Sequence, residues 1–280
     1  MKILVTGASG QLGHDVCREL TARGIENRGT SSRELDITDT EAVRKYVTAY
    51  APDAVIHCAA WTAVDKAEDE YESAYAVNAE GTRALALACK ESGAKMLYIS
   101  TDYVFPGDGE RFYEPENNTG PLNAYGTTKL AGERAVKELL ERYFIVRISW
   151  AFGVNGSNFV KTMLRLAETR TELSVVCDQI GSPTYTADLA PLLCDMIMTE
   201  KYGTYHATNE GVCSWAEFAQ TIFRLAGRDV TVCPIPTSQY PTRAVRPLNS
   251  RMSKAKLDTM GFRRLPCWQD ALMRYLKELA

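Results

Sequence analysis

The stretch that most constrains the fold is a glycine-rich turn near the start of the chain. Residues 2–5 are a short apolar run, and residues 6–13 carry three glycines in the spacing G-x-x-G-x-x-G, followed by an amphipathic stretch. A buried strand that turns on glycines into a helix gathers backbone N–H groups and the positive helix end at one point, which suits a pyrophosphate. We expect Gly7 to allow the tight turn, Gly10 the close approach of a phosphate, and Gly13 the packing of helix on strand. A glycine-rich turn without a ligand is the alternative, so the rest of the chain must decide.

Composition limits the kinds of protein this chain can be. With 280 residues and 45% hydrophobic content it can bury a large core, and we expect one large α/β domain and one smaller one. A net charge of −3 and the lack of any basic block argue against a nucleic-acid partner. No apolar run reaches the length of a membrane span, so we expect a soluble, cytoplasmic protein that does not bind membranes.

Cysteine and histidine usage argues against disulfides and metals. The eight cysteines are scattered without a C-x-x-C pair, and three histidines provide no zinc-ligand spacing. We therefore predict buried free thiols, no disulfide and no catalytic metal.

Alternating apolar runs and helical patterns predict a Rossmann-type, doubly wound parallel sheet. Strands are expected within 26–33, 52–60, 95–100 and 144–148, with a short strand end at Leu35–Ile37. Helices are expected after a cap at Thr38 or Asp39, over 71–92 and from Asn123 to about 140. Residues 1–150 are predicted to form the dinucleotide-binding domain, with 173–200 packing back on it. Residues 151–172 and 201–280 are predicted to form a smaller, discontinuous substrate-binding lobe.

The loop after the second strand bears on cofactor choice. An acidic residue about twenty positions after the glycines would hold the ribose of NAD, but this chain has Ser31-Ser32-Arg33 there. Hydroxyls followed by an arginine suit a 2′-phosphate, which favours NADPH, whereas the neighbouring Glu34 keeps NADH open. A solvated role for Arg33 is the alternative, and Asp36 is expected to line the adenine pocket.

A tyrosine and a lysine four residues apart are the strongest candidates for catalysis. Tyr125 and Lys129 fall within the helix expected from Asn123, so they share one helix face. We expect the ammonium to lower the pKa of the phenol and make it a proton donor near neutrality. Thr101, at the end of a neighbouring strand, is expected to hydrogen-bond the same substrate oxygen.

Together these features resemble the extended short-chain dehydrogenase/reductase family. Segments at 58–66, 100–105, 147–150, 158–163 and 178–184 resemble, more narrowly, the dTDP-4-dehydrorhamnose reductases. The resemblance implies reduction of the 4-keto group of dTDP-4-dehydro-6-deoxy-L-mannose to dTDP-L-rhamnose. It also implies that Tyr125 is the proton donor, Lys129 its electrostatic partner and a nicotinamide-ribose contact, and Thr101 a hydrogen-bonding residue.

The candidate binding residues follow from the turn, the loops and this resemblance. Cofactor contacts are expected at Gly7, Gly10, Gln11, Leu12, Gly13, Arg33, Asp36, Ile37, Ala59, Ala60, Trp61, Thr62, Tyr125 and Lys129. Substrate contacts are expected at Thr101, Asp102, Tyr125, Trp150, Asn158 and Arg246. The guanidinium groups of Arg243 and Arg246 suit a diphosphate, with solvated loop charges as the alternative. His206 is expected to pack rather than to catalyse.

Two departures from the family pattern, and three alternatives, remain open at this stage. Trp61 stands where relatives often carry histidine, and the acidic residue after the second strand is missing. Some family members bridge a dimer through magnesium and glutamates. Asp15 does not match such a ligand, so no magnesium is predicted, and a homodimer stays open. The alternatives are a nucleotide-sugar epimerase or dehydratase, or a non-catalytic subunit like the regulatory beta subunit of methionine adenosyltransferase.

Overall fold

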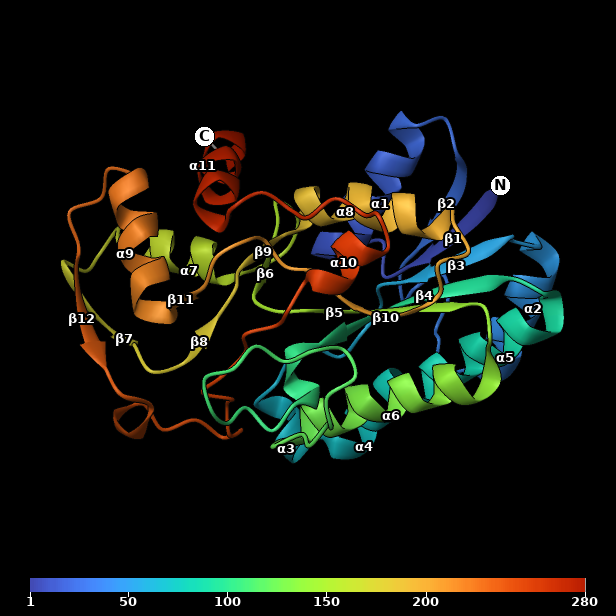
Figure 1. Cartoon of the computed structure of the whole chain (residues 1–280), viewed down its shortest axis with the longest axis horizontal. Helices are drawn as coiled ribbons and strands as arrows, with labels where there is room; N and C mark the ends of the chain where they lie inside the picture. Colours follow the sequence, from blue (N-terminus) through green and yellow to red (C-terminus); the bar gives the residue numbers. More distant parts are fainter. Residues whose placement is uncertain (280) are drawn as a thin grey trace.

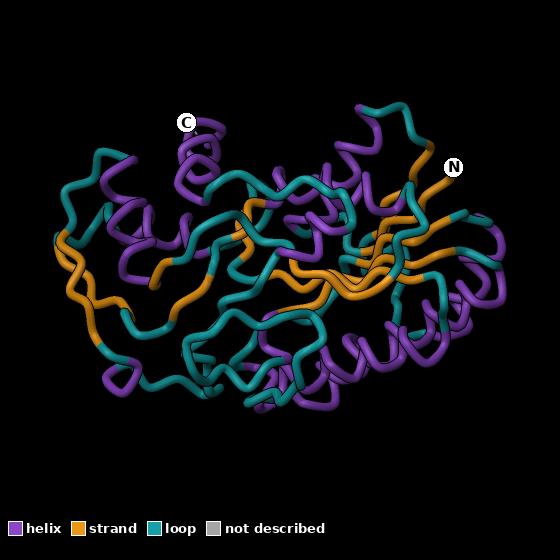
Figure 2. The backbone as a smooth tube through the Cα atoms, viewed as in Figure 1, coloured by secondary structure: helices purple, strands orange, loops and turns teal. Residues whose placement is uncertain are grey.

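A computed structural model describes residues 1–279. Within them, six parallel strands form one sheet in the order β10-β5-β4-β3-β1-β2 (Figures 1 and 2). These strands are β1 (Lys2–Thr6), β2 (Glu26–Thr30), β3 (Ala54–His57), β4 (Lys95–Thr101), β5 (Tyr143–Ile148) and β10 (Gly203–His206). The order reverses beside β1, so the crevice at the carboxyl ends of β1 and β3 is the expected ligand position. The predicted α/β class with a doubly wound parallel sheet is confirmed.

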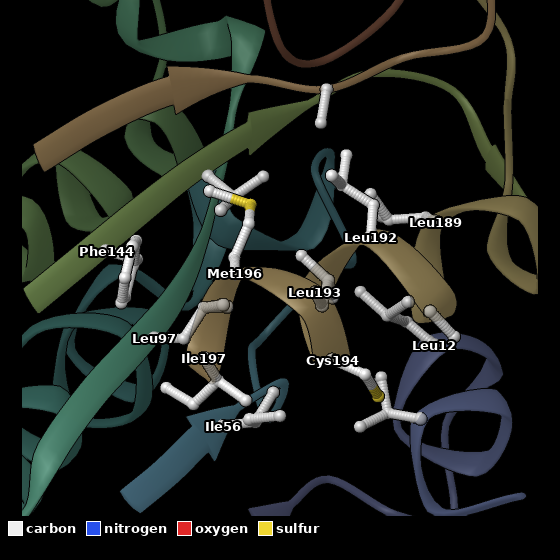
Figure 3. Close-up of a cluster of buried hydrophobic side chains, with 14 of the residues drawn as sticks. Leu12, Ile56, Leu97, Phe144, Leu189, Leu192, Leu193, Cys194, Met196 and Ile197 are labelled. Carbon is white, nitrogen blue, oxygen red and sulfur yellow. The ribbon is translucent and has the colours of Figure 1, made fainter. Parts of the chain in front are cut away.

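Helices cover both faces of this sheet. On one face lie α1 (Gln11–Ala22) and α8 (Thr186–Ile197), and Figure 3 shows α8 directing leucines and Met196 toward β3, β4 and β5. The other face is covered by α2 (Thr40–Tyr50), α5 (Thr82–Ser92) and α6 (Ala124–Leu139). Parallel strands buried on both faces need apolar runs, which β3 has at 54–56 and β5 at 143–146.

Local sequence explains where these helices begin. Asp39 caps α2 and Asn123 caps α6, each accepting a hydrogen bond from a first-turn N–H group. The helix predicted over 71–92 consists of α4 (Tyr71–Tyr75), the π-helical turn η1 (Ala76–Gly81) and α5. It follows α3 (Lys66–Asp69). Gly81 therefore lies within the helical run as the last residue of the π turn.

A smaller lobe packs around an aromatic core beside the sheet, at the left in Figure 1. Three strand pairs build it: β7 (Glu172–Val176) with β12 (Thr231–Ile235), β6 (Ala151–Phe152) with β9 (Thr184–Tyr185), and β8 (Ile180–Gly181) with β11 (Cys213–Ser214). Its helices are α7 (Phe159–Leu166), α9 (Trp215–Leu225) and α11 (Trp268–Leu279). Short elements complete the chain: η2 (Asp102–Val104), η3 (Thr237–Gln239) and α10 (Ala255–Thr259).

Three predicted placements are wrong. Residues 35–37 form no strand, because Leu35 and Ile37 reach the core from a turn instead of from a sheet. The segment 203–206 belongs to the main sheet as β10, paired with β5, and not to the smaller lobe. The segment 172–176, predicted to pack back on the first domain, pairs instead with β12 of the lobe; α8 alone carries that packing.

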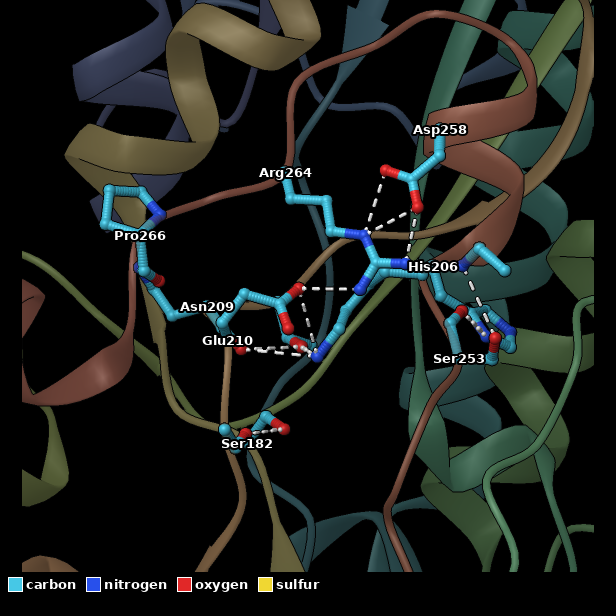
Figure 4. Close-up of polar contacts among 12 residues, drawn as sticks. Ser182, His206, Asn209, Glu210, Ser253, Asp258, Arg264 and Pro266 are labelled. Carbon is cyan, nitrogen blue, oxygen red and sulfur yellow. Dashed lines mark hydrogen bonds and ion pairs between the residues drawn. The ribbon is translucent and has the colours of Figure 1, made fainter.

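A polar network joins β10 to the C-terminal segment. Arg264 donates to Asp258 with Nε at 3.0 Å and reaches Glu210 at 3.5 Å, while Asn209 donates to the Pro266 carbonyl (Figure 4). His206 is buried and contacts the Ser253 carbonyl, so the prediction that it packs fits its position. All eight cysteines, each within the described residues, are free thiols. Among residues 1–279, no helix has the length and apolar character needed to traverse a bilayer.

Candidate active site

A cleft of about 850 Å³ opens where the strands of the main sheet end. It is bounded by the glycine-rich turn, the loops after β3 and β4, the start of α6 and the segment after β5. Most of the predicted site residues line it: Gly7, Gly10, Gln11, Leu12, Gly13, Asp36, Ile37, Ala59, Ala60, Trp61, Thr62, Thr101, Asp102, Tyr125, Lys129 and Trp150. Parts of the chain far apart in sequence thus share one cavity.

The glycine-rich turn has the geometry of a phosphate cradle. Gly7 has a φ of +72°, and a Cβ there would lie 2.6 Å from the Ala59 nitrogen. A Cβ on Gly13 would lie 2.2 Å from the Gly7 oxygen, so helix α1 can approach the turn only with glycine at that position. No side chain of the described residues caps the start of α1 at Gly10. The first-turn N–H groups are therefore free to bind an anion, which fits a dinucleotide pyrophosphate.

The far end of the cleft fits an adenosine ribose, although only part of the predicted set lies there. Ser31, Ser32 and Asp36 line the cleft, whereas the exposed Arg33 is not among its lining residues. Glu34 accepts hydrogen bonds from the backbone N–H and the hydroxyl of Ser31, both at 2.8 Å. Arg33, which favoured a 2′-phosphate in the sequence analysis, thus does not line the cleft, whereas Ser31 and Ser32 do.

Helix α6 brings the two candidate catalytic side chains to the cleft on one face. The Lys129 ammonium is buried, donates to the Ile99 carbonyl at 2.7 Å and lies 4.1 Å from the ring centroid of Tyr98. Burial lowers the pKa of Lys129 to about 7, against the opposing effect of Glu133. This lysine can therefore gain or lose a proton near neutrality.

The expected effect of Lys129 on Tyr125 is wrong. Burial raises the pKa of Tyr125 well above its ordinary value, and the neighbouring Thr101 hydroxyl, not the lysine, lowers it in part. The physical reason is that desolvation of a buried phenol disfavours its charged form. The phenol therefore holds its proton firmly, as a proton donor must before the reaction begins.

Asp102 is a buried carboxylate held by two hydroxyls. Thr101 Oγ1 donates to its Oδ1 at 2.9 Å, and Ser250 donates to its Oδ2. Burial raises the pKa of Asp102 to about 6, although both hydrogen bonds oppose that shift. The Thr101 hydroxyl also accepts from the Tyr103 N–H at 3.2 Å. The Thr101 hydroxyl thus lies between Asp102 and Tyr125.

A buried ion pair ties α6 to β5 behind the site. Arg147 donates from Nε and Nη2 to the two carboxylate oxygens of Glu133, each at 2.8 Å, and from Nη1 to the Pro115 carbonyl at 3.0 Å. Both side chains are at most 1% exposed. Burial is the largest single effect on the pKa of Glu133 and raises it, but the hydrogen bonds and charge of Arg147, with smaller help from Ser100 and Lys137, together hold that pKa below its usual value. The pair fixes the helix that carries Tyr125 against the sheet.

Two predicted substrate contacts do not line the cleft. Asn158 caps α7 by accepting from the Lys161 N–H, and its amide donates to Gln11 at 3.0 Å and to the Tyr275 hydroxyl. Arg246 forms a two-pronged ion pair with Asp65, at 3.0 and 2.7 Å. Both side chains hydrogen-bond other residues of the protein. For Arg246, this position matches neither of the two roles considered from the sequence, a free group that binds a diphosphate or a solvated loop charge.

Sequence reasoning missed one buried residue that supports the cleft. Asn78, in the π turn η1, accepts from the Trp61 N–H at 2.9 Å and donates to Thr128 on α6 at 3.0 Å. It therefore joins the loop after β3 to the catalytic helix. An asparagine on the buried side of an apolar helical pattern was the available indication. π turns are enriched at functional sites, but they have no sequence pattern from which they could be predicted.

Comparison with known proteins agrees with this geometry. The family model described as the RmlD substrate binding domain matches residues 1–280. A dTDP-4-dehydrorhamnose reductase of Streptomyces griseus is 46% identical, over 96% of this chain and 91% of the relative. The spore coat polysaccharide biosynthesis protein SpsK of Bacillus subtilis is 41% identical, over 99% of this chain and 97% of that protein.

A solved structure of high similarity carries a nucleotide. The crystal structure of dTDP-4-dehydrorhamnose reductase from Bacillus anthracis in complex with NADP matches with a TM-score of 0.96 and 47% identity, covering 99% of this chain and 100% of that one. The resemblance stated from the sequence is confirmed. The chain belongs to the RmlD substrate binding domain family, the family of the dTDP-4-dehydrorhamnose reductases.

Proposed function

We propose that this chain reduces the 4-keto group of dTDP-4-dehydro-L-rhamnose to give dTDP-L-rhamnose, with NADPH as reductant. The observation that carries the proposal is that Thr101, Tyr125 and Lys129 line the same cleft as the glycine-rich turn. The relatives named above as dTDP-4-dehydrorhamnose reductases, at 46% and 47% identity, support the choice of substrate.

Each part of the cleft has a task in this reaction. The turn at Gly7–Gly13 would hold the pyrophosphate, and Ser31, Ser32 and Asp36 would face the adenosine ribose. When bound, the dinucleotide supplies the hydride that reduces the ketone. Tyr125 gives its proton to the oxygen of the reduced carbon, and Thr101 hydrogen-bonds the same substrate oxygen.

The two charged neighbours assist Tyr125 in different ways. Lys129, one helical turn further along α6, stabilises the negative charge that develops on the phenol oxygen as the proton leaves. Because burial brings the pKa of Lys129 to about 7, it can also take part in returning a proton to the site. Asp102 orients Thr101 by accepting its proton and offers its carboxylate to a sugar hydroxyl.

A direct assay tests the reaction and the role of Tyr125. NADPH absorbance is followed with dTDP-4-dehydro-L-rhamnose, and the sugar product is identified by mass and NMR. We expect Tyr125→Phe to lose about 10²- to 10⁴-fold in kcat, because it lacks the donated proton, while NADPH binding measured by fluorescence stays unchanged. Tyr46→Phe, on α2 outside the cleft lining, is the control and should keep wild-type turnover.

Other outcomes of this assay would contradict the proposal. Conversion of the sugar without net consumption of NADPH would indicate an epimerase or dehydratase. No turnover of any nucleotide sugar, together with binding to a methionine adenosyltransferase catalytic subunit, would indicate a regulatory subunit. Repeating the assay with NADH measures the cofactor preference, for which Ser31 and Ser32 favour NADPH and Glu34 opposes it.

We also propose a cytoplasmic location and a small-molecule nucleotide sugar as the binding partner. The eight free thiols suit a reducing compartment. Whether a second copy of the chain joins to form a homodimer stays a prediction, and light scattering of the purified protein measures it.

A further inference from the structure

Trp150 adopts a backbone conformation that bulky residues avoid. Its φ is +49°, in the left-handed region, although it is neither glycine nor asparagine. Hydrogen bonds of Ser149 and of Trp150 itself hold this geometry. Ser149 Oγ donates to the Ser182 carbonyl at 2.7 Å, Thr184 Oγ1 donates to the Ser149 carbonyl at 2.6 Å, and the Thr184 N–H donates to the Trp150 carbonyl at 3.2 Å. Such strain persists where the surroundings fix it, and it is concentrated at functional sites. The strain directs the Trp150 side chain into the cleft lining.

A second indole holds one face of this side chain. The rings of Trp150 and Trp215 are stacked, with centroids 3.8 Å apart and planes inclined by 16°. Phe159 packs against Trp215, with ring centroids 4.6 Å apart. Trp215 itself is not among the residues that line the cleft. It therefore contacts Trp150 from behind.

The position of Trp215 is fixed by its own element. It is the first residue of α9, and the preceding Ser214 forms a capping box with Glu217 in which each side chain binds the other's backbone N–H group. The pairing of β11 with β8 places Cys213 opposite Gly181 and so brings the start of α9 to the cleft. The indole of Trp215 thus lies on a rigid support.

Gly181 packs against the edge of the Trp150 ring. A Cβ there would lie 2.9 Å from the Cε2 and Cζ2 atoms of Trp150, and 3.1 Å from the Cβ of Ser250. Ser250 in turn donates to Asp102. The edge of the Trp150 ring and Ser250, which hydrogen-bonds Asp102, therefore both pack against Gly181.

We propose that Trp215 is a positioning residue that holds the Trp150 indole as a rigid wall against the deoxysugar ring of the substrate. The inference rests on the proposed function. Trp150 has one face on Trp215 and one edge on Gly181, so the remaining surface of the indole is offered to the cleft beside Asp102 and Tyr125. An apolar wall suits the C–H bonds and the methyl group of a 6-deoxysugar, and a fixed wall sets the angle at which the ketone meets Tyr125.

The test replaces Trp215 and measures steady-state kinetics and circular dichroism. Trp215→Leu should raise KM for the nucleotide sugar about tenfold, since an aromatic pair of this kind is worth up to about one decade in an equilibrium constant. KM for NADPH should stay unchanged, because Trp215 does not line the cleft that contains the glycine-rich turn. The far-ultraviolet couplet of two stacked indoles should disappear. Trp215→Phe keeps an aromatic support and should restore most of the sugar KM without restoring the couplet.

A matched control separates positioning from general loss of structure. Trp268→Phe removes another indole of the same lobe, which packs edge-on against Phe218 and is not among the ring partners of Trp150. It should keep the couplet and both KM values. If Trp215→Leu does not fold, Trp215→Met, which also removes the aromatic support, is compared with Trp268→Phe in its place.

The outcomes distinguish this inference from the function on which it rests. If the wild-type chain does not turn over the dTDP-4-keto sugar, the proposed function fails. If the wild type is active and Trp215→Leu loses the couplet but keeps the wild-type KM for the sugar, the positioning role alone is overturned. Equal increases in KM for the sugar and for NADPH would also overturn it, because they indicate a general structural defect.

Discussion

Asp102 couples the state of the cleft to pH. Its carboxylate is 3% exposed, and its ordinary pKa of 3.8 rises to about 6 because burial disfavours the charge. Ser250 and Thr101 each donate a hydrogen bond to it and limit the rise. At neutral pH the folded protein therefore holds this carboxylate mostly in its charged form, although burial disfavours the charge.

This shift predicts how stability changes with pH. Because the folded pKa lies above the unfolded one, the folded state binds more protons between pH 3.8 and about 6, so stability falls as pH rises through that window. Asp102→Asn has no such titration. Between about pH 4.5 and about pH 7 the wild type should lose about 2 kcal/mol relative to this variant, measured by urea unfolding at both pH values. A constant difference between the two proteins would show that Asp102 does not titrate there.

The residues of the cleft differ in how readily sequence predicts them. Tyr125 and Lys129 could be paired because helical spacing alone places them on one face. The pKa of Tyr125 could not be predicted, because it depends on burial by segments far away in the chain. Trp150 could be placed by resemblance, whereas its stack on Trp215, 65 positions later in the chain, follows only from the pairing of β8 with β11.

Among the elements, α6 and β5 are joined by a charge pair that sequence gave no reason to expect. Glu133 and Arg147 are nearly unexposed, and each satisfies the other through two hydrogen bonds. A buried pair of this kind adds little net stability compared with apolar residues, but loss of one partner leaves an uncompensated charge. The pair therefore acts mainly by holding α6, the helix that carries Tyr125, in a fixed position along β5.

Substitution on each side of the pair tests this role. Arg147→Met should cost about 3–5 kcal/mol in urea unfolding, because the buried Glu133 carboxylate loses its two short hydrogen bonds and keeps only the half-exposed Lys137, 3.7 Å away. The double variant Glu133→Leu with Arg147→Met should recover most of that loss. As a control, Arg83→Met breaks an exposed ion pair between Arg83 on α5 and Glu138 on α6. It should change stability little. A double variant as unstable as Arg147→Met would mean that packing, not charge, carries the effect.

The elements that sequence misplaced share a physical cause. Apolar periodicity reveals that a segment is buried, but not against which partner. The run at 203–206 has the pattern of a strand, yet only the long connection through α8 returns it beside β5. Leu35 and Ile37, predicted as a strand end, are buried, but they reach the core from a turn that packs near Gly81 of η1.

At the scale of the whole molecule, the chain crosses repeatedly between the sheet and the smaller lobe. It enters the lobe after β5, returns through α8 and β10, and passes back through β11 and α9. Hydrogen bonds also join the two parts at the cleft, where Gln11 accepts from the Gly153 N–H at 2.8 Å and Asn155 donates to the Ser9 carbonyl at 2.7 Å. Neither part is a continuous segment that could unfold on its own.

We therefore expect one cooperative unfolding transition, shifted as a unit by NADPH. Far-ultraviolet circular dichroism reports all helices, whereas three of the four tryptophans that give the emission, Trp150, Trp215 and Trp268, belong to the lobe cluster. The two urea curves should coincide. NADPH at a hundred times its Kd should move both by about 2.7 kcal/mol, because it binds only the folded cleft. Gly13→Ala, whose Cβ would collide with the Gly7 carbonyl, serves as the control and should abolish this shift. Separate curves, with NADPH moving only the circular dichroism, would mean that the lobe unfolds independently of the dinucleotide site.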